Sequence, residues 1–166
     1  MNLSPVFLMK FKNTVERILH VRGNYNGGIL EMAVILDHNV EREVVQELLP
    51  LLFRTLKMHS EVFRNVRLNI VQWESDEKIE NQVTPMSMAG LPSYYDKYIK
   101  YESRKDVHKL VQYLKVFQAR AKLMILITDG ENEAGGVESL KTAMQPFLDK
   151  KLMRIVVGEK LEIQYR

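Results

Sequence analysis

The 166-residue sequence has no cysteine, which excludes disulfide bonds, thiolate metal ligands and cysteine nucleophiles. It also lacks long apolar runs. No stretch approaches the roughly 20 residues needed to cross a bilayer, so we expect no membrane span. Lys10 and Lys12 interrupt the first apolar stretch, and no small-residue cleavage site follows it. We therefore expect no signal peptide and a cytoplasmic location.

A large excess of one charge is also missing, because 24 Lys and Arg face 21 Asp and Glu for a formal charge of +3. The charge is unevenly distributed along the chain. Residues 1–23 carry four bases and one acid, residues 94–122 are also basic, and residues 129–138 hold acids without a base. No basic stripe occurs together with stacking aromatics on a predicted strand, so we expect no nucleic acid partner.

What the chain does contain is the composition of a globular domain, with 46% apolar and 27% charged residues. Apolar side chains recur at helical spacing in four segments, which are residues 5–20, 41–58, 105–119 and 137–150. Apolar or alternating runs predict strands at residues 32–36, 66–73, 79–83, 123–127, 153–157 and 161–165. This alternation predicts an α/β fold with a doubly wound, mostly parallel, Rossmann-like sheet flanked by helices. We divide the chain into an N-terminal helix and linker, residues 1–28, and an α/β domain, residues 29–166.

Local signals predict several details of the helices. Ser4 and Pro5 favour a helix start, with Ser4 as the N-cap. Pro50 lies inside the second helical segment and predicts a kink or a break there. Ser103 and Asp106 have the spacing of a capping pair at the start of the third helix.

Two of the buried strands end in an aspartate, in the segments Leu36-Asp37 and Ile127-Thr128-Asp129. In a doubly wound sheet, ligands bind outside the carboxyl ends of the strands, where the strand order reverses. Carboxylates that converge there suit Mg²⁺ or another hard cation. Both aspartates could instead cap the helices that follow their strands.

The segments Asp37-His38-Asn39-Val40-Glu41 and Thr128-Asp129-Gly130 resemble those of the von Willebrand factor A-type domain family. That family carries Asp-x-Ser-x-Ser after its first strand, a Thr in a middle loop, and Thr-Asp-Gly after its fourth strand. Together these form a metal-ion-dependent adhesion site. The resemblance spans residues 30–158 and implies a role in protein–protein recognition. Its metal ligands would correspond to Asp37, Asn39, Glu41, Ser103 and Asp129.

The sequence departs from the family at both serines, which are Asn39 and Glu41 here. Ser103 is the best counterpart of the middle-loop Thr, ahead of Thr84 and Ser87. Glu41 would bring a third carboxylate and leave a formal charge of −1 even around a divalent ion. We therefore predict a degenerate site that is metal-free, or that holds a divalent cation such as Mg²⁺ in a structural role.

These observations predict a non-enzymatic protein-interaction or scaffolding module that uses the strand-end crevice. A cluster of aromatic and basic residues supplies a candidate partner-binding surface, namely Tyr94, Tyr98, Tyr101 and Arg104. The same cluster could simply pack on the domain. His38 is interpreted as a packing or surface residue rather than a catalytic one. The alternative function is an Mg²⁺-dependent enzyme that acts on a phosphorylated substrate, although no base or anion clamp is evident beside the aspartates.

Overall fold

The computed structural model describes residues 4–19, 29–58, 65–85, 98–103, 105–117, 121, 123–129, 151–156 and 162–165. The predicted helix at residues 137–150 lies outside these residues, as do Tyr94 and Arg104. None of the described helices is long and apolar enough to cross a membrane.

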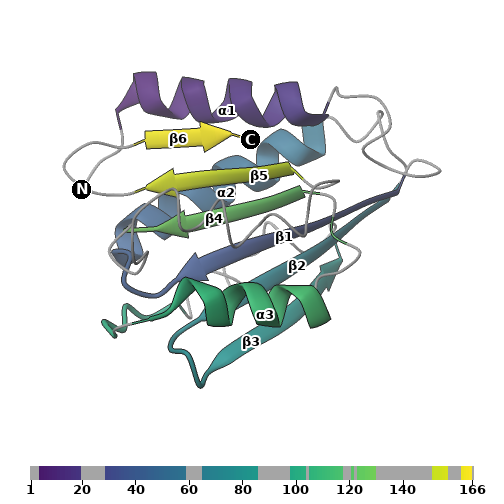
Figure 1. Ribbon diagram of the computed structural model, residues 1–166. Coiled ribbons are helices and arrows are strands. Elements are labelled where there is room, and N and C mark those ends of the chain that lie inside the picture. The colour runs from purple at the N-terminus through teal and green to yellow at the C-terminus, as the bar shows by residue number, and fades with distance from the viewer. Residues whose placement is uncertain are drawn as a thin grey trace.

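Three helices and six strands make up the described part of the chain (Figure 1). The helices are α1 (Pro5–Leu19), α2 (Arg42–Met58) and α3 (Val107–Phe117). The strands are β1 (Ile29–Asp37), β2 (Asn65–Trp73), β3 (Ile79–Pro85), β4 (Leu123–Thr128), β5 (Lys151–Val156) and β6 (Glu162–Tyr165). Each strand that was expected from the sequence is present, most of them one to three residues longer at one or both ends.

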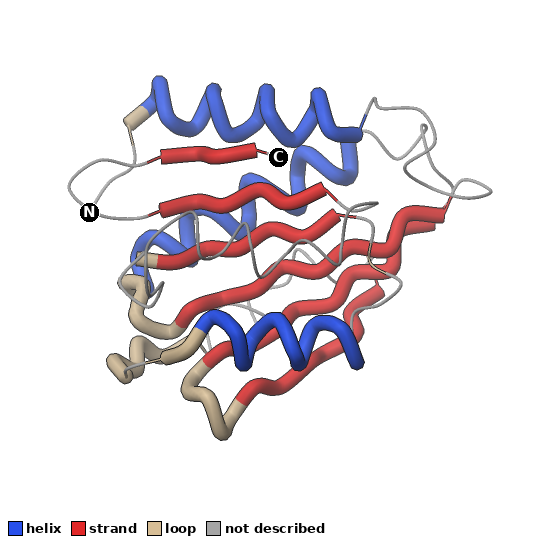
Figure 2. Tube along the Cα trace, viewed as in Figure 1, coloured by secondary structure: helices blue, strands red, loops and turns tan. Residues whose placement is uncertain are grey.

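All six strands form one sheet in the order β3-β2-β1-β4-β5-β6 (Figure 2). The pairings β1–β2, β1–β4 and β4–β5 are parallel, whereas β3 pairs with β2 and β6 pairs with β5 in the antiparallel sense. The sheet is therefore mixed, and the predicted α/β class is confirmed. Both antiparallel strands lie at its edges.

Helices cover both faces of the sheet, with α2 behind it and α3 in front of it in Figure 1. Residues that alternate along a strand point to opposite faces, so each central strand serves two cores. Met32, Val34 and Leu36 of β1 join the cluster beneath α1 and α2. Ala33 and Ile35 join the cluster beneath α3. Burial on both faces explains why β1 has a continuous apolar run.

The N-terminal helix begins as its sequence predicts, because the Phe7 backbone N–H donates to Ser4 Oγ over 3.1 Å. Phe7 and Phe11 of α1 are buried in the same cluster as α2. The predicted break at Pro50 is wrong, since α2 continues through that residue to Met58. Packing of the apolar stripe of α2 against the sheet offsets the one backbone donor that Pro50 lacks.

The start of α3 differs from the predicted capping pair. Asp106 alone acts as the cap, with Oδ1 accepting from the His108 backbone N–H over 2.9 Å. The Asp106 N–H donates to Asp76 Oδ1 over 2.8 Å, while the Ser103 hydroxyl donates to the Glu74 carbonyl over 2.9 Å. Both residues of the expected pair therefore bind the loop between β2 and β3 instead of each other.

Candidate functional site

The candidate site lies where the strand order changes direction, between β1 and β4. Leu36 is in register with Ile127, so the next residues, Asp37 and Thr128, come side by side at the carboxyl ends of the two strands. The Thr128 hydroxyl donates to Asp37 Oδ2 over 2.7 Å. Asp37 Oδ1 accepts from the Asn39 backbone N–H over 3.0 Å. The Asp37 carboxylate is fully buried, so these bonds replace the water that it loses.

A buried lysine supplies a positive charge to the same carboxylate. Lys105 Nζ lies 3.1 Å from Asp37 Oδ1, and both side chains are inaccessible to solvent. The same ammonium donates to Asn39 Oδ1 over 2.7 Å. It also lies 5.9 Å from the centroid of the Trp73 ring, within the range of a cation–π contact. Buried charges persist in proteins when they are paired and hydrogen-bonded, as this pair is.

Residues 98–103, here called the crossing segment, pass over the ends of β1 and β2. The Tyr101 N–H donates to the His38 carbonyl over 2.7 Å. Asn39 and Ser103 bind each other twice, because Ser103 N donates to Asn39 Oδ1 over 3.0 Å and Asn39 Nδ2 donates to the Ser103 carbonyl over 3.2 Å. Asn39 thus joins the crossing segment to the Asp37–Lys105 pair.

Tyr98 lies inside the domain rather than on the predicted contact surface, with only 2% of its area exposed. Its hydroxyl donates to the carbonyls of Asp37 and Val40, over 3.1 and 2.5 Å. Burial raises the pKa of Tyr98 well above its usual range, and the negative charges of Asp37, Glu41 and Asp129 raise this pKa further. Tyr98 is therefore a neutral anchor of the crossing segment.

His38 is a packing residue, in agreement with the sequence interpretation. Its ring packs against Tyr98 in a tilted arrangement with the centroids 4.4 Å apart. Nδ1 lies 2.9 Å from the Ile99 carbonyl, which can only accept, and Nε2 lies 2.6 Å from Gln72 Oε1. Both ring nitrogens are therefore engaged in holding the crossing segment to β1 and β2.

The structure brings together part of the predicted ligand set. Asp37 and Asn39 share the Lys105 ammonium, but Ser103 contributes backbone groups because its hydroxyl points to the Glu74 carbonyl. The Glu41 carboxylate is exposed and paired with Lys100, whose ammonium also lies 3.0 Å from Glu102. These carboxylates raise the pKa of Lys100, chiefly because its ammonium donates a hydrogen bond to Glu41. Asp129 is half-buried at the end of β4.

The chemistry of this donor set fits an ammonium group better than a divalent cation. The Lys105 side chain already neutralises Asp37 and occupies the space between the Asp37 and Asn39 oxygens. A metal ion would have to displace the buried Lys105 ammonium, which cannot diffuse away because it belongs to the chain. Among the described residues, no group of three or more His, Asp or Glu side chains is placed to hold a metal ion.

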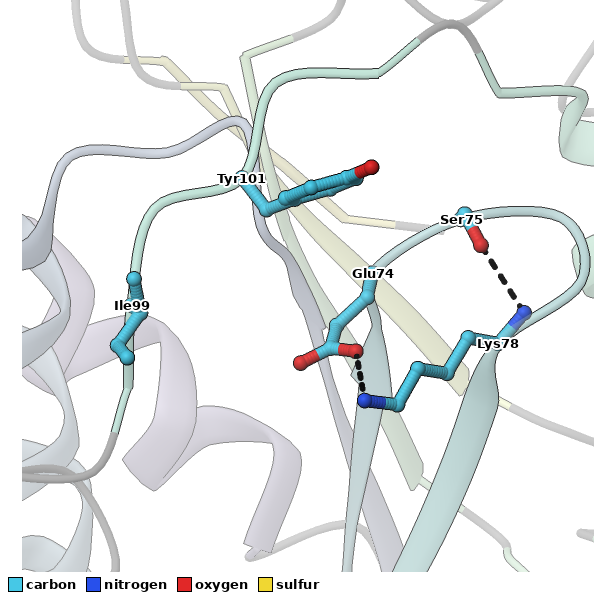
Figure 3. A pocket seen from close by; sticks show the side chains of 5 residues that line it. All are labelled: Glu74, Ser75, Lys78, Ile99 and Tyr101. Carbon is cyan, nitrogen blue, oxygen red and sulfur yellow. Dashed lines mark hydrogen bonds and ion pairs between the residues drawn. The ribbon is translucent and has the colours of Figure 1, made fainter.

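We call Asp37, Asn39, Lys105 and Thr128 the strand-end cluster. A pocket of about 400 Å³ opens beside this cluster (Figure 3). It is lined by Glu74, Ser75 and Lys78 of the β2–β3 loop and by Ile99 and Tyr101 of the crossing segment. Lys78 Nζ lies 2.8 Å from Glu74 Oε2, and the Lys78 N–H donates to Ser75 Oγ over 3.0 Å. The Tyr101 ring and the Glu74–Lys78 pair come from opposite walls of the pocket.

Sequence reasoning missed the role of Lys105, which lies in a basic stretch at the start of the predicted helix at residues 105–119. One signal could have indicated it. Asp37, Glu41 and Asp129 give the predicted crevice three carboxylates, more than a divalent ion can neutralise. Such an excess of negative charge near a buried aspartate indicates that a cationic side chain of the same chain neutralises it.

Searches of protein-family models and of curated proteins find no match to this chain.

Proposed function

We propose that this chain is a doubly wound, von Willebrand A-like domain that acts as a non-enzymatic protein-interaction or scaffolding module without a metal ion. The strand order, the helices on both faces of the sheet and the position of Asp37 beside Thr128 support this reading of the fold. The mixed pairing at the two edges is compatible with it, because the three central pairings are parallel.

One observation carries the functional part, namely the buried Lys105 ammonium between Asp37 and Asn39. A metal that bridges to a partner or activates a substrate must keep an open coordination position. Lys105 is inaccessible to solvent, so its ammonium holds Asp37 and Asn39 in place and cannot contact a partner or a substrate. Asn39 in turn holds Ser103 of the crossing segment. The cluster thereby stabilises the surface above it, which remains available to a protein partner.

We define this strand-end surface as residues 38–41, 74–78 and 99–103. Its backbone is fixed from below by hydrogen bonds from Tyr98, Tyr101 and Ser103. A loop surface that is already ordered loses little conformational entropy on binding. This arrangement suits recognition of another protein.

The metal-free part of the proposal is tested by thermal melts with EDTA and with millimolar Mg²⁺, Mn²⁺ or Ca²⁺. We expect the Tm of the wild type to change by no more than about 1 °C, since a ligand shifts stability only if it binds the folded state. Lys105→Met should destabilise the domain by about 3–5 kcal/mol because Asp37 loses its cation. In that variant, we expect Mg²⁺ to raise the Tm.

Lys109→Met is the matched control, since Lys109 is exposed on α3. If Lys105→Met does not fold, the double variant Lys105→Met/Asp37→Asn removes both charges and should recover a cooperative melt without a response to Mg²⁺. A wild-type Tm that rises by several degrees with Mg²⁺, and no longer does so in Asp129→Ala, would show that the site binds metal and would refute the proposal.

The interaction part is tested by site-specific photo-crosslinking in cells of the source organism. A benzophenone amino acid is placed at Glu102, of which the side chain is 74% exposed, and in a control protein at Gln112 on the outer side of α3. We expect discrete protein adducts from position 102 that are absent from position 112. Equal adducts at both positions, or Mg²⁺-dependent hydrolysis of p-nitrophenyl phosphate by the purified protein, would contradict the proposal.

A further inference from the structure

The pocket beside the strand ends has an exposed apolar wall. Ile99 and Tyr101 are 71% and 58% exposed, although Tyr98 is buried and Ser103 is half-buried, each held to the domain by a hydrogen bond. The Tyr101 backbone is fixed by its hydrogen bond to the His38 carbonyl. A large aromatic ring is thus presented to solvent on a segment that is anchored on either side of it.

The opposite wall of the pocket presents a carboxylate. Glu74 Oε2 is paired with Lys78, a residue whose side chain is 57% exposed. The hydrogen bond that Lys78 donates to Glu74, together with the nearby charges of Glu74 and Glu80, raises the pKa of Lys78. Exposed ion pairs of this kind contribute little to stability because water screens their charges. Lys78 can therefore give way to a cation that binds Glu74 with better geometry.

The charge of the surrounding surface favours a basic partner. The strand-end surface contains Glu41, Glu74, Asp76, Glu77 and Glu102 against Lys78 and Lys100, a formal charge of −3 with His38 neutral. Both lysines are already paired with carboxylates of this surface. Nucleic acids and anionic membranes would be repelled by this charge, whereas a basic segment of a protein would be attracted to it.

We propose that this pocket binds an arginine side chain of a protein partner, stacked on Tyr101 and paired with Glu74. A guanidinium group is planar, stacks on aromatic rings and donates two parallel hydrogen bonds to a carboxylate. A lysine ammonium cannot make the bidentate contact. A volume of about 400 Å³ lies within the range of pockets that bind small ligands. Ile99 adds an apolar contact for the methylene groups of the arginine. This inference rests on the proposed interaction function and names the chemistry of its partner.

The test is an NMR titration of the ¹⁵N-labelled protein with the peptide acetyl-Gly-Arg-Gly-Arg-Gly-amide and its lysine analogue, at equal ionic strength. We expect the arginine peptide to shift amide signals of residues 74–78 and 99–101. The lysine peptide should bind at least about fivefold more weakly, because it loses the stacking and the bidentate pairing.

Two substitutions address the two walls of the pocket. Glu74→Gln and Tyr101→Leu should each weaken arginine binding at least about fivefold. Glu77→Gln is the matched charge control, because Glu77 lies exposed in the same loop but does not line the pocket. Phe117→Leu is the aromatic control, as Phe117 is exposed on α3. The ¹⁵N spectrum of each variant verifies its fold before the titration.

Equal affinity for the arginine and lysine peptides would overturn the proposal, as would an equal loss in Glu77→Gln and Glu74→Gln. Absence of any shift at residues 74–78 and 99–101 would overturn it as well. These failures leave the interaction function intact if the crosslinks at position 102 are still formed, and the partner would then bind by another chemistry. A wild type that binds Mg²⁺ would refute only the metal-free part of the proposed function, because the interaction part is decided by the crosslinks and the arginine site by the peptide titration.

Discussion

At the scale of single residues, the strand-end cluster consists of side chains that satisfy one another rather than an external ligand. Asp37 accepts hydrogen bonds from the Thr128 hydroxyl and the Asn39 backbone, and Lys105 neutralises its charge. A buried ion pair contributes little net stability compared with an apolar pair of similar volume. It does, however, strongly penalise any arrangement in which one partner loses the other. The value of Lys105 therefore lies in fixing the positions of Asp37 and Asn39.

Tyr98 leads to a prediction about alkaline pH. Its pKa is raised in the folded protein, so the folded state retains a proton that the unfolded state loses above about pH 10. Stability from this group is complete below pH 10 and falls as the pH rises, by about 1.4 kcal/mol per pH unit. Tyr98→Phe should lower stability by about 1–2 kcal/mol at pH 8, because the carbonyls of Asp37 and Val40 lose a donor.

Urea unfolding followed by circular dichroism at pH 8, 10 and 11 measures both effects. We expect the difference in stability between the wild type and Tyr98→Phe to shrink as the pH rises from 10 to 11. Tyr101→Phe is the control, because this ring is exposed and its loss of the hydroxyl should leave the profile unchanged. A constant difference across the whole series would show that Tyr98 ionises equally in both states.

At the scale of elements, periodicity predicted most of the fold but little of the site. The expected strands at residues 32–36 and 123–127 lie within β1 and β4, and the expected helix at residues 105–119 contains α3. Burial on both faces gives such strands a continuous apolar run that is visible in the sequence. The pairing of Lys105 with Asp37 leaves only an indirect sign, the excess of carboxylates, because the contact itself depends on how the crossing segment and α3 lie over strand ends that are distant in sequence. The same lack of a local signal explains why the sequence leaves open whether Tyr98 contacts a partner or packs on the domain.

The N-terminal helix gives a prediction at this scale. Phe11 of α1 is fully buried in the cluster shared with α2 and the sheet, whereas Met9 is 66% exposed. Phe11→Ala should lower the free energy of unfolding by about 3–5 kcal/mol through lost burial and the cavity left behind. Met9→Ala should change it by less than about 0.5 kcal/mol. Chemical denaturation of the two variants measures these values, and similar stabilities for both would show that α1 contributes no core.

At the scale of the whole molecule, the two cores share the strands of one sheet. Face-alternating residues of β1 belong to both clusters, with Leu36 in the cluster beneath α2 and Ile35 in the cluster beneath α3. Loss of packing on one face frees these strands and thereby removes the support of the other face. We therefore expect the domain to unfold as a single cooperative unit.

The single tryptophan of the chain makes this cooperativity measurable, because Trp73 lies in the cluster beneath α3 and reports on that face alone. Phe11→Ala perturbs the opposite face, yet it should lower the urea midpoint seen by Trp73 fluorescence as much as the midpoint seen by circular dichroism. Leu110→Ala, beneath α3, should cost about 2–5 kcal/mol by both probes. The double variant should lose the sum of the two single losses to within about 0.5 kcal/mol, because Phe11 and Leu110 belong to separate clusters on opposite faces of the sheet. Separate fluorescence and dichroism transitions in Phe11→Ala would instead show that the two faces unfold independently.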